Sequence, residues 1–576
     1  MTTSLIDAES VLAIDLGSVQ TRAILFDVVD GQYRFIASGC AASTVNAPYR
    51  DVGESVTHAV KQLQEVTGRV FISPTTSNIL LPTQKDGTGV DRLVVTYTAG
   101  PELRIIAAGL LPDVSLESAQ RLVSTIYGKV VDTISLNDRR RNEAQLDAII
   151  SAQPDLIILA GGTERGASRS VFKLVELILL VCRLLPQEKR PQVLYAGNQL
   201  LAKKIQEVLE KWTHIIVAPN VRPTIDQEDL GPAQEAFMQV VTGVRMNQIG
   251  GLQQLGSVSS TPPIPGSYGM GRIMRFMSQI MDPNRGVLGV DLGSNSTTLA
   301  AASAGKMALD VYPYGAGAGA TRTLEASSLA EIAAWLPVHV TESTLRDYIY
   351  QKSLDPNVLP LTSETLAIEQ SLARQALRLS MNQLSGHWQN APYFEPIFAS
   401  GSILTQAPTP AQALLMLLDG LQPMGITTVL LDQNGLLPLL GAIAKMNSVL
   451  PVQVIESGAF MNLGTVISPV SDARYGTPIL RVRLVHEDGG GESNLEVRQG
   501  NLLVLPIPFG QKAKLQLQTL HRTEIEPRVR RNPGGFTIVG GVCGAVIDAR
   551  GRPLGLPKDD ARRREMIKKW ALTLGG

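Results

Sequence analysis

The chain has 576 residues, 44% hydrophobic and 18% charged, with no net charge at pH 7. It is too long for one hydrophobic core, which stops growing at roughly 250–300 residues, and its composition excludes disordered and fibrous classes. Its three cysteines are far apart and have no metal-ligand spacing, so we expect no structural zinc. No signal peptide is evident, and no apolar run is long enough to span a bilayer. We therefore expect a cytoplasmic protein without a membrane partner.

The predicted elements begin with a strand, a turn at Gly17–Ser18 and a second strand, in the stretch VLAIDLGSVQTRAILFDV at 11–28. A helix follows and stops at Gly68. Strands and helices then alternate, which predicts a mostly parallel α/β insertion at about 90–220, within a first lobe of residues 1–250. One of its buried strands ends at Gly161 and Gly162, which we interpret as a strand cap more readily than as part of a cleft.

Residues 251–285 are rich in Gly, Ser and Pro and are expected to be a linker or a domain junction. A second lobe at 286–463 opens with VLGVDLGSNSTTLAAASA, which repeats the first motif 276 residues later (291 − 15). From 464 to 576, short runs of period two predict a β-rich C-terminal domain that ends in a basic helix. Residues 474–576 carry 18 Lys/Arg and 10 Asp/Glu, a net of +8, which we interpret as solvated surface; no specific nucleic-acid partner is expected.

The repeated Asp-x-Gly-Ser turn has a clear chemical use. Glycine lets a backbone approach a phosphate, and arrays of N–H groups bind anions. The aspartate binds no phosphate itself, but it holds Mg²⁺ directly or through water, because this ion prefers carboxylate and phosphate oxygens. We therefore expect the two turns to face each other across a cleft and to hold the phosphates of one nucleotide between them.

This pattern resembles the superfamily of acetate and sugar kinases, Hsp70 and actin. The resemblance implies an α/β, two-lobed actin-like ATPase fold made of duplicated ribonuclease H-like units, and it implies ATP and Mg²⁺ as cofactors. Asp15 and Asp291 would be the catalytic and metal-binding residues. The implied nucleotide-binding residues are Gly17, Ser18, Thr21, Arg22, Gly293, Ser294, Asn295, Ser296 and, at the adenosine, Gly401 and Ser402. Gly435 and Gly441 match a second hinge segment.

The order of motifs along the whole chain looks like the MutL/GlmL family, which accompanies adenosylcobalamin-dependent glutamate mutase and is unrelated to the mismatch-repair protein of similar name. It includes DLIILAGGT, FASGSILT and the C-terminal GAVIDARGRPLGLP. The resemblance implies an ATP-binding accessory or reactivating protein whose partners are mutase subunits. Oligomeric state, and whether ATP is hydrolysed or only bound, stay open; a slow ATPase fits best, since no further catalytic base stands out.

Three alternatives stay open. A small-molecule kinase of the same fold would need a hydroxyl-binding pocket, and residues 325–390 carry no signature of one. An actin-like scaffold would assemble on nucleotide addition. A degenerate clamp that binds no nucleotide is disfavoured by the complete pair of Asp-x-Gly-Ser turns.

Overall fold

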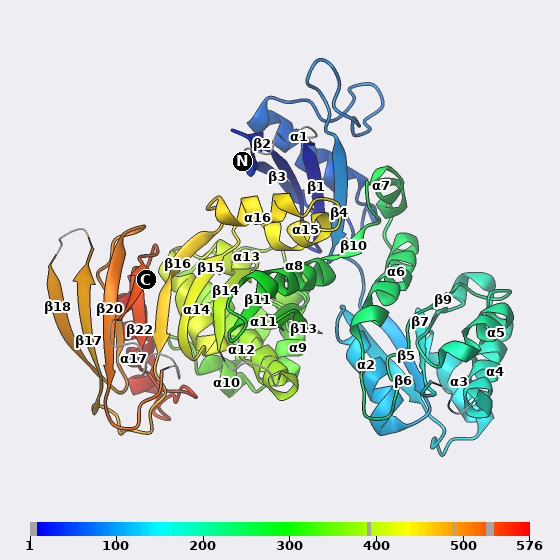
Figure 1. Cartoon of the computed structure of the whole chain (residues 1–576). Coiled ribbons are helices and arrows are strands. Elements are labelled where there is room, and N and C mark those ends of the chain that lie inside the picture. The colour runs from blue at the N-terminus through cyan, green and yellow to red at the C-terminus, as the bar shows by residue number, and fades with distance from the viewer. Residues whose placement is uncertain are drawn as a thin grey trace. The chain divides into compact units, whose positions relative to one another are not determined.

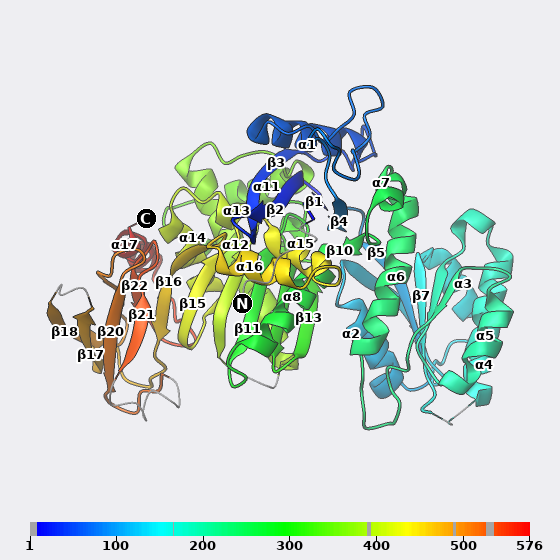
Figure 2. The same ribbon diagram turned by 45° about the horizontal axis from the view of Figure 1, so that its top comes forward.

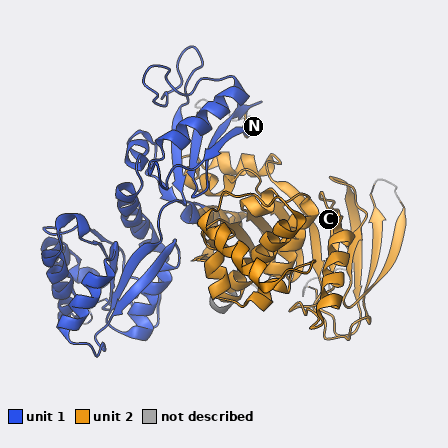
Figure 3. Ribbon diagram, turned by 180° about the vertical axis from the view of Figure 1, so that it is seen from behind, with its two compact units in different colours: residues 1–31, 35–269 blue, residues 32–34, 270–576 orange. Residues whose placement is uncertain are grey.

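The computed structural model describes residues 9–164, 166, 168–388, 393–487, 491–525 and 535–575. The chain divides into two compact units (Figure 3), the first made of residues 1–31 and 35–269 and the second of residues 32–34 and 270–576. Both contain helices and sheets, so the predicted α/β class is confirmed. No helix of the described part combines the length and apolar character that a membrane crossing requires.

The first unit begins with the strand–turn–strand motif (Figure 1). Its sheet has the order β10-β4-β1-β2-β3, in which β1 runs antiparallel to β2 and parallel to β4, with the bounds β1 (Val11–Leu16), β2 (Gln20–Val29), β3 (Gln32–Ala42), β4 (Arg92–Tyr97) and β10 (Ile264–Pro265). Helix α1 (Gly53–Thr67) packs closely on it, because Gly39 in β3 leaves room: a Cβ there would lie 2.1 Å from the Ala59 carbonyl oxygen. The helix ends at Gly68 in a left-handed conformation, as predicted.

A second sheet of the first unit lies between β4 and β10 in the sequence. It is wholly parallel, with the order β6-β5-β7-β8-β9, and the bounds are β5 (Leu103–Gly109), β6 (Gly128–Ile134), β7 (Leu156–Ala160), β8 (Gln192–Tyr195) and β9 (Ile215–Val217). Apolar side chains cover both of its faces, which explains the near-continuous apolar run of β7. The helices of this unit are α2 (Glu117–Val123), α3 (Asn142–Ala152), α4 (Ser168–Leu184), α5 (Gln199–Leu209), α6 (Gly231–Gln248) and α7 (Leu252–Val258), with short turns η1 (Pro112–Leu116) and η2 (Gln187–Lys189).

The second unit contains an eight-stranded sheet. Its order is β13-β12-β11-β14-β15-β16-β22-β19, with the bounds β11 (Gly286–Leu292), β12 (Thr297–Ser303), β13 (Lys306–Tyr312), β14 (Phe394–Ser400), β15 (Gly425–Leu431), β16 (Met461–Ser468), β19 (Leu502–Leu505) and β22 (Ala545–Asp548). β11 is antiparallel to β12 and parallel to β14, which is the arrangement that β1 has with β2 and β4. The structure therefore duplicates the strand order, as the repeated motif predicts.

Helices cover both faces of this sheet. Figure 2 shows α12 and α14 beside it, and their apolar residues share one core with β11, β12, β14 and β15. On the other face, glycine at 289 makes room for Met270 and Met274 of α8. The bounds are α8 (Gly266–Ile280), α9 (Ala320–Glu325), α10 (Leu329–Ala333), α11 (Glu342–Leu354), α12 (Ser363–His387), α13 (Ser402–Thr405), α14 (Pro410–Leu421), α15 (Leu436–Ile443) and α16 (Val449–Glu456). Residues 251–285, expected as a linker or a domain junction, form α7, β10 and α8, and the boundary between the two compact units falls within them.

The C-terminal region is rich in strands, as predicted, but part of it completes the second unit's sheet. β19 and β22 extend that sheet, while a separate antiparallel sheet has the order β18-β17-β20-β21, with the bounds β17 (Pro478–His486), β18 (Glu492–Arg498), β20 (Lys512–Thr519) and β21 (Phe536–Val539). The last helix, α17 (Asp560–Leu574), contributes Trp570 to the same core as α12 and α14.

A buried ionic network fixes this attachment. The Arg550 side chain is fully buried and donates to Asp548 at 2.8 Å and to Asp419 of α14 at 2.7 Å. Burial alone would raise the pKa of Asp548, but the guanidinium groups of Arg550 and Arg552 hold that pKa well below its usual range. Arg374 of α12 donates to the other Asp419 oxygen at 2.7 Å, so the network joins the C-terminal strand to two helices of the sheet's core.

Removing one member of this network should destabilise the second unit strongly. We expect Arg550→Ala to lower the free energy of unfolding by about 3–5 kcal/mol, because it removes one of the two guanidinium groups that pair with each buried carboxylate. Arg498→Ala is the matched control: it removes an exposed pair with Glu496 and should cost about 0–1 kcal/mol. Urea denaturation followed by tryptophan fluorescence measures both, and equal losses would contradict the assignment.

Candidate functional site

The first hairpin closes through a backbone bond at its glycine. The Gly17 N–H donates to the Gln20 carbonyl oxygen at 3.0 Å, and a Cβ at Gly17 would lie 2.5 Å from that oxygen. No side chain therefore fits at this position. Since the Gly17 N–H is already bonded, an anion at this turn would take its hydrogen bonds from the residues after it, such as the half-buried Ser18.

Asp15 is the penultimate residue of β1, and only Leu16 separates it from the turn. Thr96 at the end of the parallel β4 donates its hydroxyl to one Asp15 oxygen at 2.9 Å, and Arg22, the cross-strand partner of Asp15, lies 3.7 Å from the other. Burial raises the pKa of the Asp15 carboxyl, although Arg22 and Thr96 oppose the shift. The structure therefore brings Asp15 and Arg22 together, and it adds Thr96, which the sequence analysis did not assign.

The second hairpin repeats this geometry without the cation. The Gly293 N–H donates to the Ser296 carbonyl oxygen at 3.0 Å. Asp291 is the penultimate residue of the corresponding strand and is half-buried, and its cross-strand partner is Thr298, where the first hairpin has Arg22. Ser294, Asn295 and Ser296 of this turn are all half-buried. The two turns therefore share a backbone shape and differ in charge.

Thr21 lies beneath the first turn instead of on its surface. It is fully buried, and its hydroxyl donates to Ser55 of α1 at 3.0 Å. Thr297 occupies the equivalent position of the second hairpin, is also fully buried and donates to the Tyr314 carbonyl oxygen at 2.6 Å. In both units this threonine anchors the hairpin to the interior, which is a different role from the phosphate contact that the resemblance implies for Thr21.

A glycine-rich segment at 315–319 covers the second turn. Gly317 and Gly319 donate their N–H groups to the Ser294 carbonyl oxygen at 3.0 and 2.9 Å, and the Ala318 N–H donates to the Ser294 hydroxyl at 3.2 Å. A Cβ at Gly315 would lie 2.2 Å from the Ser294 carbonyl oxygen. The alternation of glycine in GAGAG is therefore a steric requirement of this contact, and it is the signal by which the sequence could have assigned the segment.

Gly401 and Ser402 lie at the same edge of the sheet as Asp291. Gly401 has a φ of 117°, and a Cβ there would lie 2.2 Å from the Leu292 carbonyl oxygen, so the segment that the resemblance assigns to adenosine packs on the end of β11. Asp432, at the end of the neighbouring β15, accepts the Leu436 and Leu437 N–H groups at 2.9 and 2.8 Å. This edge of the second unit thus gathers Asp291 with two chain segments that lie more than 100 residues after it in the sequence (401 − 291 = 110; 432 − 291 = 141).

The other glycines singled out in the sequence lie in turns or inside a helix. A Cβ at Gly161 would lie 2.8 Å from Leu110, and Gly162 has a φ of 76°, so this pair ends β7 in a packed turn, in keeping with the strand cap. Gly435 precedes α15 with a φ of 69°, whereas Gly441 lies inside that helix.

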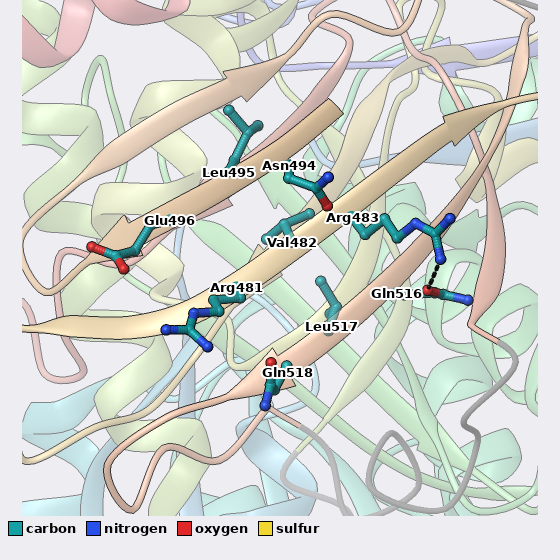
Figure 4. Close-up of a pocket in the computed structure, with 9 residues that line it drawn as sticks. All are labelled: Arg481, Val482, Arg483, Asn494, Leu495, Glu496, Gln516, Leu517 and Gln518. Carbon is teal, nitrogen blue, oxygen red and sulfur yellow. Dashed lines mark hydrogen bonds between the residues drawn. The ribbon is translucent and has the colours of Figure 1, made fainter. Parts of the chain in front are cut away.

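A cavity of about 500 Å³ lies on the C-terminal antiparallel sheet (Figure 4). Arg481 and Arg483 of β17 stand on it beside side chains of β18 and β20, and Arg483 donates to Gln516 at 3.3 Å. The Arg483 guanidinium also donates two hydrogen bonds to the Glu492 carboxylate, one to each oxygen. The polar residues that line this cavity belong to neither hairpin and to no glycine turn. The cavity therefore has no part in the candidate site.

The raised pKa of Asp15 predicts a cost to stability. The unfolded chain loses this proton near the ordinary pKa of 3.8 and the folded unit only at higher pH, so stability falls as the pH rises through that interval. We expect Asp15→Asn to raise the unfolding free energy of the nucleotide-free protein at pH 7. Asp548→Asn is the control with the opposite sign, because the arginines beside Asp548 hold its pKa low. Thermal unfolding of both variants between pH 4 and 8 tests this, and a destabilised Asp15→Asn variant would refute it.

The contact of Gly401 with β11 should be intolerant of any side chain. We expect Gly401→Ala to destabilise the second unit by about 1–3 kcal/mol, because it combines a strained φ with a clash against Leu292. Gly458→Ala is the control: Gly458 also has a positive φ but has open space around it, so this variant shows the cost of backbone strain without a steric clash. If urea denaturation shows equal losses of unfolding free energy in the two variants, the Leu292 contact does not contribute to the stability cost.

Comparison with known proteins adds an independent finding. A family model described as "MutL protein" matches residues 11–458. Among solved structures, the chain is similar to a nucleotide-free acetone carboxylase (12% identity, 86% of this chain and 81% of that chain, TM-score 0.36), to a glycerol dehydratase reactivase (10%, 76% and 100%, 0.30) and to xylulose kinase from Bifidobacterium adolescentis (12%, 80% and 96%, 0.29). No curated protein matches the chain. The duplicated strand order and the family match identify an actin-like ATPase fold.

Proposed function

The chain belongs to the glutamate mutase-associated MutL family, and we propose from this that it is an ATP-binding and ATP-hydrolysing accessory protein of an adenosylcobalamin-dependent mutase such as glutamate mutase. The observation that carries the proposal is the duplicated hairpin, in which an aspartate one residue from the end of a strand precedes a turn that a glycine N–H closes. A Cβ at the glycine would lie 2.5 Å from the Gln20 carbonyl oxygen in the first turn and 3.1 Å from the Ser296 carbonyl oxygen in the second.

The residues present fit ATP with Mg²⁺. In the described part of the chain, no three His, Cys, Asp or Glu side chains gather as a metal cage. Mg²⁺ does not require one, since it is commonly bound through one or two carboxylates, phosphate oxygens and water. Asp15 and Asp291 are the carboxylates that would hold it, and the ion would supply positive charge to the phosphates.

Each hairpin would perform a distinct part of nucleotide binding. Ser18 and Ser294 offer hydroxyl and backbone groups to phosphate oxygens, and Arg22 adds a positive charge in the first unit alone. Because Thr96 holds Asp15 by a hydrogen bond, that carboxylate is already oriented before a ligand arrives. Gly401 and Ser402 would receive the adenosine at the edge of the sheet that carries Asp291.

We propose that the ATP state shifts the protein between two conformations, because only a ligand with different affinity for two conformations shifts their balance. A mutase held in one state and freed in the other would then exchange damaged cobalamin for intact cofactor. This role follows by analogy with chaperones that reactivate radical enzymes.

Nucleotide binding and turnover test the proposal directly. Isothermal titration should give one ATP per chain, and Asp15→Ala and Asp291→Ala should each lower Mg²⁺-dependent ATP turnover at least tenfold, because each removes a charge that orients the ion. Purified mutase subunits should stimulate turnover by the unmodified protein. Arg498→Ala, which changes an exposed pair on the C-terminal sheet, is the control and should leave turnover unchanged.

Two results would oppose this function. Turnover that survives both aspartate substitutions would remove the role of the hairpins. A normal ATPase that neither binds nor responds to any subunit of a cobalamin mutase would leave the nucleotide site in place and reject the partner.

A further inference from the structure

Three leucines are exposed together where α11 ends and the chain turns toward α12. Leu354, Leu359 and Leu361 are 88%, 65% and 89% exposed, and all lie within residues 354–361, which we call the leucine loop. Tyr350, on the last turns of α11, is 51% exposed. Single exposed apolar residues are ordinary on protein surfaces, whereas a contiguous group marks a site of interaction.

The leucine loop is held in place from inside. The buried Lys352 donates to the Val358 carbonyl oxygen at 2.5 Å and lies 2.7 Å from Glu369 of α12. Asp355 caps the turn by accepting the Asn357 N–H at 3.3 Å. The exposed leucines are therefore carried on a fixed backbone, which reduces the ordering cost of binding.

The last turn of α11, directly before the loop, contacts the segment that covers the second hairpin. The Ser353 hydroxyl donates to the Ala318 carbonyl oxygen at 3.2 Å. Gly317 lies between the two features: a Cβ there would be 2.3 Å from the Ser294 hydroxyl oxygen and 2.9 Å from Pro356 Cβ. A shift of the Ser294 turn would thus reach the leucine loop through Gly317, which lies between Ser294 and Pro356.

From these contacts we propose that the leucine loop is the docking surface for the partner mutase, and that nucleotide at the second hairpin controls its affinity. The occupant is an apolar groove of a mutase subunit, rimmed by Lys or Arg. Charge complementarity argues for that rim, because the exposed charges of residues 353–364 are Asp355 and Glu364, both acidic. The partner's identity rests on the function proposed above, and the loop and its coupling rest on the geometry.

The docking surface is tested by a paired substitution. We expect Leu359→Asp with Leu361→Asp to weaken binding of purified glutamate mutase subunits at least tenfold in biolayer interferometry, with the ATP affinity of the chain unchanged. Leu572→Asp is the matched control, since Leu572 is 74% exposed on α17 and lies outside the loop; it should bind as the unmodified chain does.

The outcomes separate the two proposals. If the unmodified chain binds a subunit and the loop variant binds equally well, the docking surface is overturned and the proposed function stands. If the unmodified chain binds no subunit, the partner falls together with the proposed function. If sedimentation shows that the loop variant loses self-association instead, the occupant is a second copy and the mutase groove is wrong.

The coupling has its own test. Gly317→Ala should reduce the ratio of subunit affinities with and without ATP to near one, because the added methyl group separates the Ser294 turn from Pro356. Gly458→Ala, which adds a methyl group to open space, should keep the full ratio. An unchanged ratio in a folded Gly317→Ala protein, checked by circular dichroism, would overturn the coupling.

Discussion

The backbone bond that closes each hairpin is the constraint on which the site depends. In both units a glycine N–H donates across the turn at 3.0 Å, to Gln20 or Ser296. The bond uses the glycine's only donor, so the groups left for an anion are those of the following residues. The aspartate occupies the penultimate position of the strand before the turn, where a parallel neighbour lies beside it. The backbone geometry of the turn therefore accounts for the repeated motif before any ligand chemistry is considered.

Given this shared backbone, the differences between the hairpins are informative. Asp15 has Arg22 and Thr96 as partners, and burial raises its pKa. Asp291 has a threonine across from it in place of an arginine, and its turn is covered by the GAGAG segment. The first hairpin thus carries a positively charged side chain and a carboxylate that a hydrogen bond already orients. The second hairpin is instead joined to another part of its unit by the hydrogen bonds of the GAGAG segment. Duplication supplied two copies of one turn, and their surroundings then diverged.

Much of this architecture was predictable, and the exceptions have physical reasons. Apolar alternation and glycine punctuation predicted the strands of both hairpins and the end of α1, because these depend on local geometry. The burial of Thr21 was not predictable, since a threonine after a turn points to either face and only the packing of α1 decides which. Residues 251–285 form helices despite their Gly, Ser and Pro content, because α8 buries methionines against β11, a contact that composition cannot show. The GAGAG segment was visible in the sequence, but its partner, Ser294, lies about twenty residues earlier (315 − 294 = 21) and only the fold brings them together.

The C-terminal region illustrates how a boundary in pattern differs from a boundary in structure. The change to period-two strands at about residue 464 is real, yet β22 pairs with β16 and Arg550 is buried against Asp419 of α14. Breaking that attachment would expose an ionic network whose charges are paired only in the folded core, so independent motion of β22 is energetically disfavoured. From β11, where Asp291 is the penultimate residue, the sheet continues through β14, β15 and β16 to β22 without a gap. The strand-rich region is therefore anchored to the same rigid sheet as the second hairpin, and a movement of that sheet would carry both together.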